Sequence, residues 1–241
     1  MIKLRNLLIT AITIVAFSSN VSAGTVSVGI TGSILDVEAS GTETDKLTAA
    51  GADVADTSIR KKTISANSVT GSLFAEYTAD YSWPITVGFE YTPGTADISS
   101  GLSRTDTATS VTGQTLAVSR SEKRTASAEA TNFSTLYLEA PLFSGLYVRA
   151  GLSHMDIDYV TTTTGTNGGS YSDNIGLSGT NLGLGFKGTS ASGMLWKLAY
   201  EQTSYDTFNL TSTGNSVAAN SNNIKGDADT SGVRLSLAKS F

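Results

Sequence analysis

The sequence predicts an all-β fold, an antiparallel up-and-down β-barrel of eight strands that spans a membrane. Segments that alternate between apolar and polar residues recur along the chain, which indicates strands whose two faces meet different surroundings. Short connections alternate with long polar ones, an asymmetry typical of barrels in the bacterial outer membrane. After the N-terminal segment, no stretch shows a sustained apolar period of 3.6 residues or the length of a transmembrane helix.

The N-terminal segment is a predicted signal peptide covering residues 1–23. Lys3 and Arg5 precede the apolar run 7–17, and Val21–Ala23 places small residues where a signal peptidase cleaves. The apolar run is shorter than the roughly 20 residues that span a bilayer, so a membrane anchor is the weaker interpretation. We therefore expect a mature barrel domain over 24–241, with no further domain.

Eight segments carry the two-residue alternation, each with apolar residues on one face and polar or small residues on the other. In chain order the apolar positions are Val26, Val28 and Ile30; Leu73, Ala75 and Tyr77; Trp83, Ile85, Val87, Phe89 and Tyr91; Leu136, Leu138 and Ala140; Leu146, Val148, Ala150 and Leu152; Leu182, Leu184 and Phe186; Met194, Trp196, Leu198 and Tyr200; and Val233, Leu235, Leu237 and Phe241. A strand over 83–91 is roughly 26 Å long, or about 20 Å across a bilayer when tilted, close to the apolar band of such barrels. A soluble β-sandwich is the alternative, but lipid requires the satisfied backbone that a closed barrel provides.

The connections predict which end of each strand faces outward. Three of them are tight, at 80–82, 141–144 and 189–193. Four are long and rich in Ser, Thr, Gly and Asn, at 41–63, 93–123, 161–172 and 203–227. Eight strands need three periplasmic turns and four external loops, which matches both counts. The segments flanking 107–119 either extend their hairpin beyond the membrane or form a ninth and a tenth strand.

Aromatic residues fall near the strand ends, where a membrane interface is expected. An amphipathic ring at the interface keeps one edge hydrated, so such residues form girdles around membrane proteins. The predicted girdle consists of Tyr77, Trp83, Tyr91 and Tyr200.

The polar faces of the strands carry four acids and four bases, which we expect inside the barrel. They are Glu76, Glu90, Glu139, Arg149, Lys187, Lys197, Glu201 and Arg234. An eight-stranded barrel is only wide enough for side chains to fill, and buried charges are tolerated when they are paired. We therefore expect a neutral network that plugs the lumen, with a proton or ion path along it as the alternative.

Other chemistry is disfavoured by the composition. The chain has no Cys and one His, and its formal net charge of −5 argues against nucleic acid as a partner. His154 follows Ser153 on a predicted strand, so the two side chains point to opposite faces, and no Gly-x-Ser-x-Gly motif occurs. The acid pairs Asp36/Glu38, Asp156/Asp158 and Asp227/Asp229 offer oxygen ligands but no complete cation site. We expect no catalytic residue, no metal and no cofactor.

The last segment, 233–241, is an amphipathic strand that ends on Phe241. With this ending, the mature chain resembles the small eight-stranded outer-membrane barrels such as OmpX, the OmpA membrane domain and opacity-type proteins. The resemblance implies that Val233, Leu235, Leu237 and Phe241 form the signal that the barrel assembly machinery recognises. Lys239 departs from this pattern, because it places a charge on the outward face.

Together these features predict a monomeric outer-membrane protein of a Gram-negative bacterium with a plugged lumen and long external loops. We expect a structural or surface-interaction (adhesin-like) role and no enzyme activity. The expected partners are outer-membrane lipid and lipopolysaccharide, the barrel assembly machinery during insertion, and an unidentified extracellular ligand for the loops. A narrow porin-like channel for small solutes is the alternative, and a lipid-modifying enzyme is a weaker one.

Overall fold

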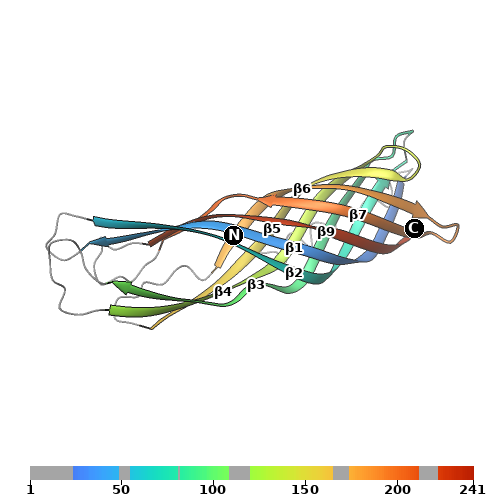
Figure 1. Cartoon of the computed structure of the whole chain (residues 1–241). Coiled ribbons are helices and arrows are strands. Elements are labelled where there is room, and N and C mark those ends of the chain that lie inside the picture. The colour runs from blue at the N-terminus through green and yellow to red at the C-terminus, as the bar shows by residue number, and fades with distance from the viewer. Residues whose placement is uncertain (1–23, 49–54, 81, 109–119, 165–173, 212–221) are drawn as a thin grey trace.

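The computed structural model describes residues 24–48, 55–80, 82–108, 120–164, 174–211 and 222–241, so the predicted signal peptide lies outside the described residues. The described chain is a closed antiparallel barrel (Figure 1). Its strands are β1 (Gly24–Thr48), β2 (Ala55–Ala79), β3 (Thr86–Ala108), β4 (Arg120–Pro141), β5 (Leu146–Thr164), β6 (Asn174–Thr189), β7 (Met194–Tyr205), β8 (Phe208–Thr211) and β9 (Asn222–Ser240). Within these ranges no helix is long and apolar enough to cross a membrane.

The barrel wall has eight members, as predicted. Each strand from β1 to β6 pairs with the next one, and β9 pairs with both β7 and β1. The short β8 also pairs with β9, directly beyond the segment that pairs with β7, so β7 and β8 form one interrupted strand of the wall. The barrel closes where Val26 and Phe241 exchange backbone hydrogen bonds of 3.3 and 2.9 Å.

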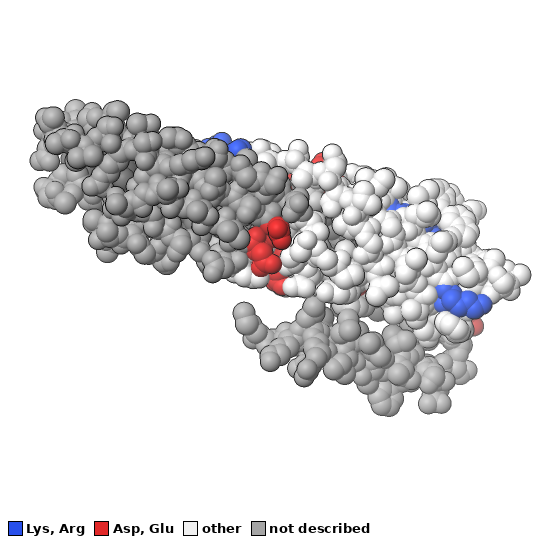
Figure 2. Space-filling model, turned by 90° about the horizontal axis from the view of Figure 1, so that it is seen from below, with Lys and Arg blue, Asp and Glu red and all other residues white. Residues whose placement is uncertain are grey.

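The outward face of the barrel is an apolar belt. Large apolar side chains that a soluble protein would bury are exposed here, among them Ile30, Leu73, Leu136, Leu182 and Leu235. Figure 2 shows this belt as a surface with few charged side chains. Such a surface is stable in contact with the hydrocarbon of a bilayer. Lipid offers no hydrogen bonds to backbone N–H and C=O groups, and the pairing of strands around the closed wall provides them instead. The chain is an outer-membrane β-barrel.

The two ends of the barrel differ as the connections predicted. The short turns 80–85, 142–145 and 190–193 lie at one end, together with the C-terminus (Figure 1). At the other end the strands continue far beyond the belt, so most of the predicted long loops 41–63 and 93–123 is strand. Threonine, which is frequent in these segments, has high β-propensity, and pairing satisfies the backbone groups of the strands even where both faces are polar.

The segments flanking 107–119 belong to the extended β3–β4 hairpin, since β3 runs to Ala108 and β4 begins at Arg120. They are not a ninth and a tenth strand.

One junction of the wall is short. β2 and β3 pair only from Thr78–Thr86 to Leu73–Tyr91, whereas the described residues of β2 beyond Leu73 pair with β1 alone. At this point β3 contains a bulge, where Pro93 lacks an N–H and Gly94 has a φ of 103°. We call the unpaired boundary between β2 and β3 beyond Leu73 and Tyr91 the β2–β3 seam.

The interior is layered. One apolar cluster contains Phe74, Leu195 and Ala238, close to the charged side chains of the Lys–Glu and Arg–Glu pairs. A larger apolar cluster lies toward the end with the long hairpins and consists of Val37, Ala130, Met155, Ile157, Leu177, Tyr205 and Ala228.

Candidate functional site

The eight charged residues that the sequence placed in the lumen come from seven strands and all lie inside the barrel. Each occupies the inward position of its strand because side chains alternate between the two faces of the wall. Five of them, Glu76, Glu90, Glu139, Lys197 and Glu201, are at most 5% exposed. The ion pairs divide the eight into two groups of four.

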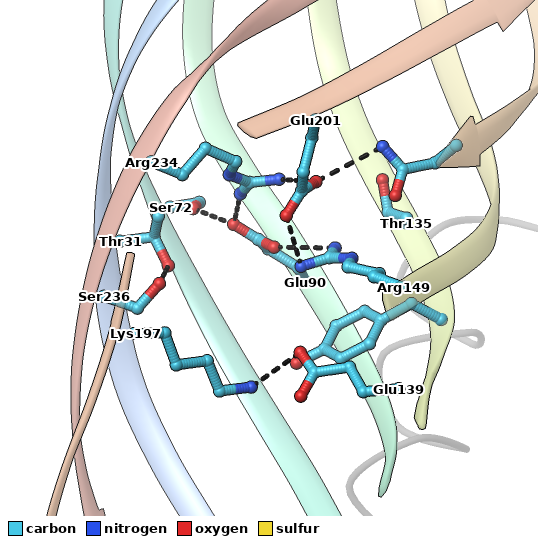
Figure 3. A network of polar contacts seen from close by, with 12 residues as sticks. Thr31, Ser72, Glu90, Thr135, Glu139, Arg149, Lys197, Glu201, Arg234 and Ser236 are labelled. Atoms are coloured by element: carbon cyan, nitrogen blue, oxygen red, sulfur yellow. Dashed lines mark hydrogen bonds and ion pairs between the residues drawn. The ribbon is translucent and has the colours of Figure 1, made fainter. Parts of the chain in front are cut away.

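The first group is a closed ring of two arginines and two glutamates (Figure 3). Arg149 forms ion pairs of 3.0 Å with both Glu90 and Glu201. Arg234 pairs with the other oxygen of each carboxylate, at 2.7 Å for Glu201. All four carboxylate oxygens are therefore engaged and the ring has no net charge. We refer to Glu90, Arg149, Glu201 and Arg234 as the Arg–Glu ring.

The second group is an open chain of two lysines and two glutamates on the side of the short turns. Lys197 pairs with Glu76 and, at 2.7 Å, with Glu139. Lys187 pairs with the other oxygen of Glu139 at 2.9 Å and donates to the Thr86 hydroxyl at 3.2 Å. This group, the Lys–Glu chain, is also neutral.

Tyr137 joins the two groups. Its hydroxyl donates to Glu76 at 2.9 Å, and the Arg149 guanidinium lies 3.7 Å from the centre of its ring. Gly88 on the neighbouring strand provides the space, because a Cβ there would lie 2.2 Å from the tyrosine ring. The sequence prediction missed Tyr137 and the equally buried Tyr147, although both share the inward parity of Glu139 and Arg149.

These contacts span the lumen. Paired and hydrogen-bonded charges are stable in a low dielectric, whereas a single unpaired charge there is costly. Around the Arg–Glu ring the structure has one cavity of about 50 Å³ and another of about 10 Å³. The arrangement holds the strands together across the lumen, and in the described part of the chain no cluster of His, Asp and Glu could hold a metal ion.

The four predicted girdle residues lie at the borders of the apolar belt. Trp83 is exposed beside the short turns, where its indole N–H donates to the Pro141 carbonyl at 2.9 Å, and Tyr77 lies near the same end of β2. Tyr91 and Tyr200 are the last outward aromatic residues of β3 and β7 before the strands extend beyond the belt.

The proposed assembly segment forms the outward face of β9. Val233, Leu235, Leu237 and Phe241 are all exposed on the belt. Lys239 also points outward, and its ammonium donates to the Ser192 carbonyl in the last short turn.

His154 lies on the outer surface and Ser153 in the lumen, so they do not form a catalytic pair. The His154 imidazole lies 3.3 Å from Asp156, which also accepts a hydrogen bond of 2.9 Å from Asn132. The Ser153 hydroxyl instead contacts Thr135 at 2.8 Å.

The remaining acid pairs lie just beyond the apolar belt. Asp36 and Glu38 occupy outward positions of β1, and Glu38 faces Asp229 across the β1–β9 pair, with Asp227 one step further out. Figure 2 shows acidic side chains at the border of the uncharged surface.

No protein-family model and no curated protein sequence matches this chain. Among solved structures, it is similar to the outer membrane protein OprG from Pseudomonas aeruginosa, with 12% identity over 91% of this chain and 96% of that one and a TM-score of 0.41. It is similar to the outer membrane protein AlkL, with 16% identity over 91% and 90% of the two chains and a TM-score of 0.41. Ail, the attachment invasion locus protein of Yersinia pestis, matches with 10% identity over 88% and 99% and a TM-score of 0.38. These likenesses concern the fold and not the function.

Proposed function

We propose that this outer-membrane barrel is closed to solutes and acts through its surface, as a structural or adhesin-like component of the envelope and not as an enzyme. The observation that carries the proposal is the filled lumen. The Arg–Glu ring and the Lys–Glu chain cross it, and the apolar cluster around Met155 fills its extracellular end.

The extracellular hairpins support a surface role. β1 and β2 pair over their full length, from Gly24–Ala79 to Thr48–Ala55, and so carry polar surface well beyond the belt. Outer-membrane lipid and lipopolysaccharide would surround the belt of a monomer, and the barrel assembly machinery would bind the β9 segment during insertion. An extracellular ligand would contact the hairpins.

A narrow channel is the second candidate, favoured by the two cavities beside the Arg–Glu ring. Against a channel, Glu76, Glu139 and Lys187 of the Lys–Glu chain line neither cavity, and only Lys197 of that chain borders the smaller one.

Two measurements test the proposal. Pure refolded protein in planar bilayers should give no stable single-channel steps, and reproducible conductance would favour the channel. Replacing residues 45–58 by a short Asn-Gly turn should leave the barrel folded and reduce attachment of cells to a host-cell layer. Unchanged attachment would remove the adhesin-like role of this hairpin.

A further inference from the structure

The larger cavity of the lumen reaches the β2–β3 seam. It measures about 50 Å³, and Glu90, Glu201 and Arg234 of the Arg–Glu ring contribute to its lining. Thr70 of β2 and Thr92 of β3 also line it, and both lie just beyond the last β2–β3 pair, Leu73–Tyr91. The cavity therefore lies where the wall lacks its ladder of hydrogen bonds.

Exposure of the lining residues shows from which side the cavity is reached. The partly exposed ones are Leu35 of β1, Thr70 of β2, Thr92 of β3, Phe133 and Thr135 of β4, and Arg234 of β9. Those on β6 and β7, including Asn181 and Thr203, are buried. The exposed side of the lining is thus mainly the side of the seam, from β1 to β4, and we infer that access runs from there.

One residue of the cavity lining, Asn181, carries an unsatisfied acceptor. Asn181 is 3% exposed, and its amide nitrogen donates to Glu201 at 3.2 Å and to Thr203 at 3.0 Å. Its Oδ1 has no partner, and neither has the buried Nε–H of Arg234, which also lines the cavity. Buried polar atoms in this state favour a guest that can both donate and accept hydrogen bonds.

The rest of the lining suits a neutral hydroxyl-bearing guest. Six of the lining residues carry hydroxyls, which can donate and accept at once: Ser33, Thr70, Thr92, Thr135, Thr203 and Thr230. The Arg–Glu ring is neutral, with every carboxylate oxygen already paired, so the floor attracts neither anions nor cations. Phe133 and Tyr205 supply aromatic surface on which the C–H face of a sugar packs.

We propose that this cavity binds the hydroxyl groups of a sugar or polyol that enters through the β2–β3 seam. A water needs about 10–15 Å³ of such space, so the cavity has room for several hydroxyl-sized groups. At the border of the belt, two sources share this chemistry: the sugars of an outer-leaflet glycolipid and a free polyol. The inference goes beyond the proposed surface role and does not depend on it.

The test uses the whole barrel in phosphatidylcholine nanodiscs, with labelled threonine methyls and asparagine side-chain amides observed by NMR. Glycerol and methyl glucoside are the free probes, and lipopolysaccharide added to the nanodisc is the lipid probe. Saturable shifts at Asn181, Thr92 and Thr203 are expected with at least one class. Shifts with the free probes identify a free polyol, and shifts with lipopolysaccharide alone identify the glycolipid.

Two variants separate binding from a general effect on the barrel. Asn181→Leu should weaken binding by about tenfold or more, because it removes the unpaired acceptor. Asn67→Leu, at an exposed outward position of β2, is the matched control and should leave binding unchanged. Thr92→Val keeps the shape of its side chain and should also weaken binding, which covers the case in which Asn181→Leu does not fold.

Three results would overturn the proposal. The first is the absence of saturable shifts with every probe, which would leave a cavity that holds only water. The second is equal binding in Asn181→Leu or, if that variant does not fold, in Thr92→Val. The third is binding of inorganic phosphate or ammonium with comparable affinity.

Discussion

Replacing Arg149 by alanine tests whether the Arg–Glu ring stabilises the barrel. The change removes two ion pairs of 3.0 Å, to Glu90 and Glu201, and the contact with the Tyr137 ring. One oxygen of each carboxylate then loses its cation, and the ring acquires a net negative charge inside the lumen. Breaking a buried pair in this way typically costs about 3–5 kcal/mol, so the free energy of unfolding should fall by that amount.

The measurement is urea unfolding in phospholipid vesicles, followed by tryptophan fluorescence and by migration of the unboiled protein on a gel. Lys61→Ala, at an exposed position of β2, is the control and should stay within about 0.5 kcal/mol of the parent. The double variant Arg149→Met, Glu90→Gln restores neutrality and should be more stable than Arg149→Ala, because fewer charges are left unpaired. If Arg149→Ala unfolds like Lys61→Ala, the ring does not contribute to stability and the argument is wrong.

Three further experiments test other parts of the structure. Gly88→Ala should destabilise the barrel by about 1–3 kcal/mol, because the new Cβ would lie 2.2 Å from the Tyr137 ring. Gly32→Ala is the control and should be tolerated, because no atom lies within 4 Å of its Cβ position. If urea unfolding shows equal effects of the two variants, the packing of Gly88 against Tyr137 is contradicted. Protease added to intact cells should cleave within 93–123 before the turn 142–145, and mass spectrometry showing the reverse order would invert the topology. Deleting Phe241 should lower the amount of protein in the outer membrane of cells. The purified variant should still refold in detergent, because one interfacial ring contributes only about 1–3 kcal/mol to the free energy of unfolding. Normal surface levels of the variant in cells would count against an assembly role of Phe241.

Several contacts of the lumen could be predicted from the sequence only in part. Parity places Glu76, Glu139 and Lys197 on one face of the wall, and a narrow barrel forces such residues together. Which cation meets which carboxylate depends on the stagger between strands that are distant in sequence. Lys197 and Glu76 are 121 residues apart. Tyr137 has the same inward parity as the charged residue Glu139, but it is uncharged. The search for charged residues on the inward face therefore missed its contacts with Glu76 and Arg149.

The amino-acid sequence by itself determined the class of fold, the faces of each strand and the end at which the short turns lie. These follow from local rules, because a strand presents alternate residues to lipid and lumen and a tight turn needs few residues. Only the tertiary structure decided how far the hairpins extend, that the Arg–Glu ring closes, and that the wall opens at the β2–β3 seam. Each of these features depends on the register between strands, which is set by the pairing of the whole barrel. The bulge at Pro93–Gly94 lies where the β2–β3 pairing ends, and no local sequence pattern reveals that β2 loses its partner there.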